Sequence, residues 1–302
     1  MLNLALIPAL SPLGIGVIRK IKARMQNRIG ASVIQPYRDI VKLFRKDEVF
    51  SEDASWISYA APYIIFGSTL ALAAGVPLFG IYAAFPTGDL LVFVYLLAAG
   101  AFFLALAGMD AGGPFGGFGA SREMMISALT EGGLVLSLVA AAFIAGTTNL
   151  TVMPGALASV PLSQLAPLIL AGAAFFIALL AENSRYPVDN PATHLELTMV
   201  HEAMILEYSG KRLALMEWAA ANKLLIFIAV FVNVFIPWGF PAELSTEALL
   251  FGVFAFFIKT LITLGAIAFI ESTMAKFRIF RVPDLLFSSF VLSAIAILII
   301  VV

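Results

Sequence analysis

The chain has 302 residues and contains no cysteine. Without thiolates it cannot form disulfides, thiolate-ligated zinc sites or cysteine-ligated iron–sulfur clusters of its own. Histidine occurs only twice, which argues against a self-contained haem or metal centre, so we expect no metal, no cofactor and no catalytic residue in this chain. The formal net charge is −1, and nothing in the composition indicates a nucleic-acid partner.

Charged residues are scarce as well. They make up 12% of the chain, about half the usual globular share, whereas hydrophobic residues make up 61%. A bilayer-spanning helix needs about 20 apolar residues. The pattern therefore predicts an all-α integral membrane protein with about eight transmembrane helices in a single polytopic domain, residues 1–302. The spans are predicted near 1–18, 57–80, 90–108, 123–146, 162–183, 215–237, 248–270 and 283–302.

The first predicted span is the shortest, and Pro8 and Pro12 interrupt it. No basic residue precedes it, so we interpret it as a spanning helix and not as a cleavable signal peptide. The basic residues set the orientation. Of the 18 lysines and arginines, all but Lys223 and Lys259 fall in the first, third, fifth and seventh loops. The positive-inside rule assigns these loops to the cytoplasm and both termini to the outside.

The first cytoplasmic loop, residues 19–56, is the most basic part of the chain. It can hold anionic lipid headgroups of the bilayer, or it can dock a soluble partner. Residues 37–46 alternate apolar and charged side chains at helical spacing, which predicts an amphipathic helix lying on the membrane face.

The third loop, residues 108–123, is rich in glycine but is not a phosphate-binding loop. It lacks the Gly-Lys-Ser/Thr end and a preceding strand. We expect a compact turn in which backbones pack closely.

Three ionisable residues lie two or more helical turns inside predicted spans. Glu131 is either a neutral, hydrogen-bonded acid or a proton-relay site. Lys259 needs a carboxylate, a water-filled cavity or a lowered pKa, and Glu131, Glu182 and Glu217 are candidate partners. Lys223 either extends to the cytoplasmic face or forms a buried pair. Glu271 closes the seventh span and is expected at the interface.

The fifth loop is the polar segment, residues 181–212. It contains both histidines and Arg185, together with the carboxylates Glu182, Asp189, Glu196, Glu202 and Glu207. Pro187 and Pro191 break any helix early in it, and Ser209-Gly210 ends it. If residues 192–207 are helical, His194 and His201 share one face, which is weak evidence for a metal site. The segment is either a solvated loop or a partly buried lining of a water-filled cavity.

Several of these motifs resemble a known family. The stretch AENSRYPVDNP, followed by LEL and EYSG, resembles the loop of the complex I membrane subunit that forms the base of the quinone chamber (the respiratory-chain NADH dehydrogenase subunit 1 family). It is more similar to the corresponding subunit of energy-converting group 4 [NiFe] hydrogenases, of the formate hydrogenlyase subunit 4 and hydrogenase-4 component C type. RMQNRIGASVIQPYRDIVKLF and GMDAGGPFGGFGASRE resemble that family's first and third cytoplasmic loops.

The resemblance implies roles for individual residues. The proton entry channel would include Glu131, Glu182, Arg185, Asp189, Glu196 and Glu207, to which we add Glu202 and Lys259 from their positions. The surface for the hydrophilic arm would include Arg24, Arg28, Gln35, Asp39, Lys42 and Arg45. The chain departs from the complex I pattern at Ala192 and His194, and it has about three extra residues between Glu196 and Glu207. These departures concern the side that faces the quinone.

We therefore expect a non-redox membrane anchor and proton-entry subunit of an ion-translocating oxidoreductase in a prokaryotic inner membrane. The [NiFe] and iron–sulfur centres would lie on hydrogenase-like large and small subunits and iron–sulfur proteins in the cytoplasm, and antiporter-like subunits would lie beside it in the membrane. The alternative is a quinone-chamber subunit of a complex I-like NADH:quinone oxidoreductase. A self-standing ion transporter is less favoured, because we find no internal inverted repeat.

Overall fold

A computed structural model describes residues 2–49, 51, 53–80, 88–190, 199–241 and 245–301. In these ranges eight helices are long and apolar enough to cross a membrane, which confirms an all-α integral membrane protein. They are α1 (Leu2–Met25), α3 (Trp56–Ala74), α4 (Leu90–Asp110), α5 (Pro114–Ala145), α7 (Leu162–Glu182), α9 (Gly210–Val230) with the π-helix η2 (Phe231–Phe235), α10 (Thr246–Thr273), and α11 (Val282–Val301) with the 3₁₀ turn η3 (Ile279–Arg281) before it. The shorter helices are α2 (Gln35–Phe44), α6 (Met153–Leu157) and α8 (His201–Ile205).

Helix α1 is longer than the predicted span and runs to Met25, so the basic residues up to Arg24 are helical. Its two prolines do not end it. Pro12 has no N–H to donate to the carbonyl of Pro8 four residues earlier. That carbonyl instead accepts hydrogen bonds from the Trp218 indole (2.9 Å) and the Ser11 hydroxyl (3.4 Å). Because the Pro8 carbonyl has these other hydrogen-bond donors, the helix continues past both prolines.

The glycine-rich third loop is mostly helical, so the predicted compact turn is wrong for most of its length. Helix α5 begins at Pro114, where the fixed φ of proline suits the first helical position. Close backbone packing is confirmed. A Cβ at Gly116 would lie 2.0 Å from the Gly108 carbonyl oxygen, and one at Gly119 would lie 2.8 Å from the Val200 carbonyl oxygen. The glycines let α5 approach both α4 and the polar segment.

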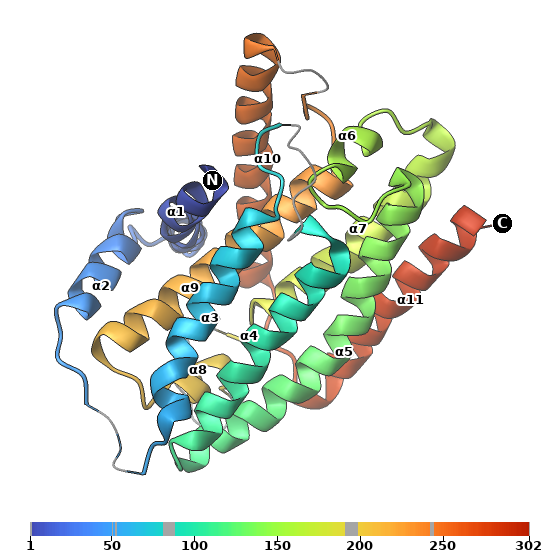
Figure 1. The fold of residues 1–302 in the computed structure, drawn as a ribbon. Coiled ribbons are helices and arrows are strands. Elements are labelled where there is room, and N and C mark those ends of the chain that lie inside the picture. Colours follow the sequence, from blue (N-terminus) through green and yellow to red (C-terminus); the bar gives the residue numbers. More distant parts are fainter. Residues whose placement is uncertain are drawn as a thin grey trace.

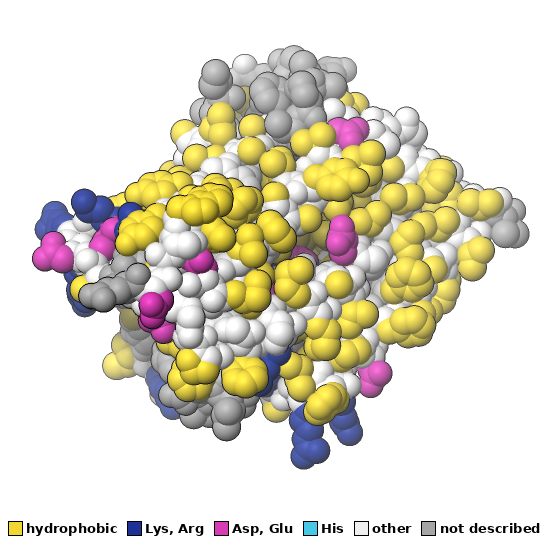
Figure 2. All heavy atoms as spheres, turned by 60° about the horizontal axis from the view of Figure 1, so that its bottom comes forward, with side chains coloured by type: hydrophobic (Ala, Val, Ile, Leu, Met, Phe, Trp, Pro, Cys, Tyr) yellow, Lys and Arg dark blue, Asp and Glu magenta, His cyan; other side chains and the backbone are white. Residues whose placement is uncertain are grey.

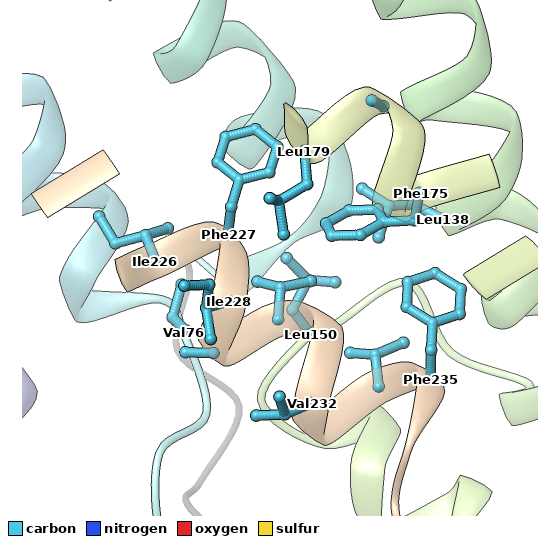
Figure 3. Close-up of a cluster of buried hydrophobic side chains, with 14 of the residues drawn as sticks. Val76, Leu138, Leu150, Phe175, Leu179, Ile226, Phe227, Ile228, Val232 and Phe235 are labelled. Atoms are coloured by element: carbon cyan, nitrogen blue, oxygen red, sulfur yellow. The ribbon is translucent and has the colours of Figure 1, made fainter. Parts of the chain in front are cut away.

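Three sets of packed helices form the bundle. Helices α5, α7 and α11 pack side by side, while α3 packs on α4, and α1 lies against α9 and α10 (Figure 1). Helix α9 is the most buried span. Figure 3 shows Phe175 between Phe227 and Phe235, with ring centroids 5.8 and 5.0 Å away. Apolar side chains cover much of the face in Figure 2, with Lys and Arg at its edges, as expected for a membrane protein.

The polar segment contains no helix that runs continuously from 192 to 207. Between Asn183 and Ser209 only the single turn α8 is helical among the described residues, and Met199 and Val200 before it are not. Ala203, Met204 and Ile205 are at most 4% exposed, whereas Leu206 is 47% exposed, so the apolar residues of the segment are buried only in part. Residues 191–198 lie outside the described part of the chain, and with them Ala192, His194 and Glu196.

Candidate functional site

A cavity of about 760 Å³ opens beside the polar segment and reaches the middle of α3 and α4. Its inner end is apolar, lined by Ile15, Ile18, Ile65, Leu72, Leu96, Leu97 and Leu104. Its other end is charged. The ten charged lining residues are Arg19, Lys22, Arg28, Glu123, Glu182, Arg185, Glu202, Glu217, Lys223 and Glu271. Five are cations and five are acids, so the formal charges of the lining balance.

Glu182, at the end of α7, pairs with Lys223 of α9. The Lys223 ammonium lies 2.8 Å from the carboxylate, whose side chain is 8% exposed. The alternative in which Lys223 extends alone to the membrane face is therefore wrong. If one partner moved away, the other charge would remain in poorly hydrated surroundings, which is unfavourable. The pair therefore holds α7 against α9 at the cavity wall.

Glu271 is held by two cations. Its carboxylate lies 3.0 Å from Arg185 of the polar segment and 3.3 Å from Lys22 of α1. The Glu271 side chain is only 3% exposed, so it is buried within the protein near the end of α10. Lys22 also lies over the Tyr186 ring, 5.0 Å from its centroid. Burial, together with the neighbouring Glu271 and Asp189 carboxylates, raises the pKa of Tyr186.

Asp189 ties the polar segment to the chain that follows α10. Its carboxylate lies 2.5 Å from the Lys276 ammonium and accepts the backbone N–H of His201 at 3.3 Å. The Phe277 N–H donates to the Pro187 carbonyl at 2.9 Å in the same region. Asp189 is 2% exposed and lies behind the cavity wall. These contacts position the lining residues His201 and Glu202.

The two lining residues of α8 have shifted pKa values in opposite directions. Burial, with the carboxylates of Glu217 and Asp189 nearby, raises the pKa of Glu202 to about 7. Burial, with the Lys223 ammonium nearby, lowers the pKa of His201 to about 4. In both cases the low-dielectric surroundings favour the neutral form. Near neutral pH, Glu202 is thus poised between its two protonation states.

The structure gathers only some of the predicted proton-pathway residues. Glu182, Arg185 and Glu202 line the cavity, and Asp189 lies directly behind it. Glu131 lies on the exposed outer face of α5, and Glu207 is exposed beside Gly113.

Lys259, a residue of α10, lies away from the cavity and beside the end of α9. Its ammonium donates to the carbonyls of Val232 (2.8 Å) and Ile236 (2.9 Å) and to the side-chain oxygen of Asn233 (3.3 Å). The carboxylate partners proposed for it are therefore wrong. Backbone carbonyls are available here because the π-helix η2 ends at Phe235 and leaves its last carbonyls without helical partners.

The predicted docking residues divide between two places. Arg28 lines the mouth of the cavity, and Arg24 lies in the last turn of α1. Gln35 donates to Asp39 at 2.9 Å, and Asp39 also lies 3.8 Å from Arg19. Lys42 and Arg45 are exposed on α2. The predicted amphipathic helix is confirmed over Gln35–Phe44.

Sequence reasoning missed three of the five acids of the cavity, Glu123, Glu217 and Glu271, and also the cation Lys22. A common depth could have identified them. Each lies within about one helical turn of the end of a predicted span, on the side that carries the basic loops, so all were expected at a similar level of the bilayer. Among the described residues, no group of three or more His, Asp or Glu side chains could hold a metal ion.

Comparisons with known proteins agree over the whole chain. The family model described as NADH dehydrogenase matches residues 1–302. Formate hydrogenlyase subunit 4 of Escherichia coli K12 is 36% identical, covering 93% of this chain and 91% of that protein. Hydrogenase-4 component C of the same organism is 37% identical, covering 95% and 90%. A subunit of the NADH-quinone oxidoreductase of Anaplasma phagocytophilum is 27% identical, covering 86% and 82%.

A solved structure shares the fold. A chain of the membrane-bound sulfane sulfur reductase, an archaeal respiratory membrane complex, superposes with a TM-score of 0.84. The match covers 99% of this chain and 97% of that chain at 23% identity.

Proposed function

Because the chain belongs to the NADH dehydrogenase family, we propose that it is the non-redox membrane anchor and proton-entry subunit of a multi-subunit, ion-translocating oxidoreductase of the [NiFe]-hydrogenase type. The charged cavity is the observation that supports this best. It brings five carboxylates and five cations into a membrane bundle, where each charge is costly unless it is paired or used.

The lining acids fall into two classes. Glu182 and Glu271 are held in ion pairs, so a proton can reach them only at the cost of a pair. Glu123, Glu202 and Glu217 take part in no ion pair among the described residues. We assign proton uptake to these three, with the paired acids and Arg185 setting the local potential.

Glu131 then passes the proton onward. It lies eight residues after Glu123 on α5, about 12 Å along the helix axis. Because its side chain is exposed on the outer face of a spanning helix, it is placed to meet a neighbouring membrane subunit. Antiporter-like subunits are the proposed neighbours. Lys259 lies apart from this route, and Glu196 lies outside the described residues.

The proposed partners on the other side are a cytoplasmic hydrogenase-like large and small subunit and iron–sulfur proteins, which carry the [NiFe] and iron–sulfur centres. The loop after α1, with Arg24, Arg28, Gln35 and Asp39, is the proposed docking surface. The proposed location is a prokaryotic cytoplasmic membrane with both termini outside, as the positive-inside rule assigns.

The test compares ion coupling with assembly. We expect Glu123→Gln and Glu131→Gln each to lower the number of protons moved per electron in inverted vesicles, with the complex intact on a native gel. Glu247→Gln, which alters an exposed acid at the start of α10, is the control. Normal proton movement in both variants would contradict the assignment.

One observation favours a second function, a quinone chamber. The cavity joins a charged end to an apolar end within the roughly 300–1,000 Å³ typical of small-molecule pockets. A quinone has a polar head and an apolar tail that match these ends. Quinone-dependent activity that Ile65→Trp abolishes, with hydrogenase activity retained, would support the quinone chamber. Full hydrogenase coupling in quinone-free vesicles would exclude it.

A further inference from the structure

One exposed face of α2 has no partner within the chain. Four cations gather on this face: Arg38 and Lys42 on α2, and Arg45 and Lys46 directly after its last residue, Phe44. None of them takes part in an ion pair in the part of the chain that the structure describes. Arg38 and Lys42, four residues apart on a helix, are neighbours and repel one another. Of the nearby acids, Asp39 is turned toward Arg19 and Glu48 toward Arg212, while Asp47 is exposed.

The helix dipole does not explain the whole face. Cations in the last turn of a helix are stabilised by the partial negative charge there, which accounts for Lys42 and Arg45. Arg38 is in the first turns, where the dipole disfavours a cation. Its position at that end calls for an anion from outside the chain.

Two side chains attach α2 to membrane-spanning helices. The hydroxyl of Tyr37, at the edge of the charged face, donates to the Ala9 carbonyl in the first half of α1. The Phe44 ring meets the Trp218 ring of α9 edge to face, with centroids 6.3 Å apart. An amphipathic helix with a basic outer face is typical of segments that lie in the plane of the bilayer interface, where that face meets lipid headgroups.

The free face of α2 also forms a groove that could hold a ligand. The four cations, with Tyr37 and Val41, line a groove of about 520 Å³. Val41 is 49% exposed among the charges and supplies apolar surface. Figure 2 shows Lys and Arg side chains, with Asp or Glu and hydrophobic ones among them, at the left edge, on the side where Figure 1 draws α2. A phospholipid has a negative headgroup phosphate beside apolar chains. The phosphate matches the four cations of the groove, and the chains match Val41.

We propose that this face of α2 is a binding site for the phosphate of an anionic phospholipid, with Arg38, Lys42, Arg45 and Lys46 around the phosphate and Val41 against the glycerol and acyl chains. The site is separate from the cavity. Lys42 and Arg45 thereby contact lipid and not a soluble subunit.

The experiment measures lipid retained by the purified complex. Nanodiscs of phosphatidylglycerol or phosphatidylcholine are compared, with bound lipid counted by native mass spectrometry after release. We expect Arg38→Gln/Lys42→Gln to bind phosphatidylglycerol about 25-fold more weakly, since each basic residue near the surface contributes about fivefold. Arg38→Lys/Lys42→Arg should retain binding. Arg278→Gln/Arg281→Gln, which alters two exposed arginines before α11, should leave this site filled.

Three results would overturn the proposal. One is equal phosphatidylglycerol affinity in the α2 variant and the control. Another is displacement of the lipid by inorganic phosphate alone, which would indicate a free-anion site. The third is loss of soluble subunits from the α2 variant with lipid retention unchanged, which would indicate a protein partner on this face.

Discussion

His201 and Glu202 are adjacent in α8, and their shifted pKa values predict a pH dependence that is visible only when one of them is removed. Burial raises the pKa of Glu202 from its ordinary value of 4.5 to about 7. The folded state therefore holds this proton more tightly, so the stability that it contributes is complete below pH 4.5 and is lost as the pH rises through about 7.

His201 has the opposite sign. Burial lowers its pKa from 6.5 to about 4, so its contribution is complete above pH 6.5 and is lost as the pH falls through about 4. At 1.36 kcal/mol per pKa unit, each residue shifts stability by about 3 kcal/mol across its window. Between pH 4.5 and 6.5 the two slopes oppose each other, so together these two residues add almost no net slope to the native profile.

Each single variant exposes the remaining slope. Relative to the native chain, the stability of Glu202→Gln should rise from pH 5 to 6.5 by about 2 kcal/mol. That of His201→Gln should fall from pH 5 to 7 by about 2–3 kcal/mol relative to the native chain. With an unfolding entropy of about 2.1 cal/mol/K per residue, this corresponds for 302 residues to apparent Tm changes of about 3–5 °C. Thermal unfolding of the solubilised complex across this range provides the measurement.

The control is Glu207→Gln, which alters an exposed acid in the same segment and should keep the native pH profile. If both single variants show the same pH profile as the native chain, opposing protonation at His201 and Glu202 is refuted. If His201→Gln becomes more stable with rising pH, the sign of the Glu202 shift is wrong.

Two further variants test packing that the structure assigns. Glu271→Gln leaves Lys22 and Arg185 without their shared carboxylate and should cost about 3–5 kcal/mol, seen as a lower apparent Tm, with Lys22→Met restoring part of it. No recovery in the double variant would argue against the ion pair as the cause. Gly16→Ala places a Cβ 1.9 Å from the Val33 carbonyl oxygen and should speed tryptic cleavage in the exposed residues 26–32, whereas Gly14→Ala meets only Leu264 at 3.8 Å and should not. Equal cleavage of the two variants would count against this close contact.

Hydropathy was sufficient to predict the eight spans, because a helix in lipid must be both long and apolar. It was insufficient at the helix ends. Helix α1 continues past its apolar run because distant groups satisfy its polar ones, such as Glu271 at Lys22 and Trp218 at the Pro8 carbonyl. Helix α5 begins early because Gly116 and Gly119 permit backbone contact. Neither cause is visible in a local window.

The site was predicted in part for the same reason. Glu182, Arg185 and Glu202 could be identified from one polar stretch, but the cavity also takes Glu123 from α5 and Glu217 from α9. A sequence shows that a charged residue is present, but it does not show which helix that residue faces. Lys259 is the clearest case. Its partners are backbone carbonyls at a helix end, and residue types do not predict which carbonyls are left without a helical partner.

The first loop and the cavity are mechanically connected through the start of α9. The backbone N–H of Val49 donates to the Ser209 hydroxyl, which in turn donates to the Val49 carbonyl. Glu48 lies 2.5 Å from Arg212, and Gly210 has a φ of +55° where a Cβ would lie 2.7 Å from Glu48.

The same helix then carries Glu217 and Lys223 into the cavity. A partner that displaces residues 48–49 must therefore either break these bonds or move the first turn of α9. Moving that turn shifts Glu217 and Lys223 relative to Glu182 and Glu202 on other elements, because α9 is a continuous helix over Gly210–Val230. Since Coulomb energies at the low dielectric of such a site change steeply with distance, we expect small displacements to change which acid holds the proton.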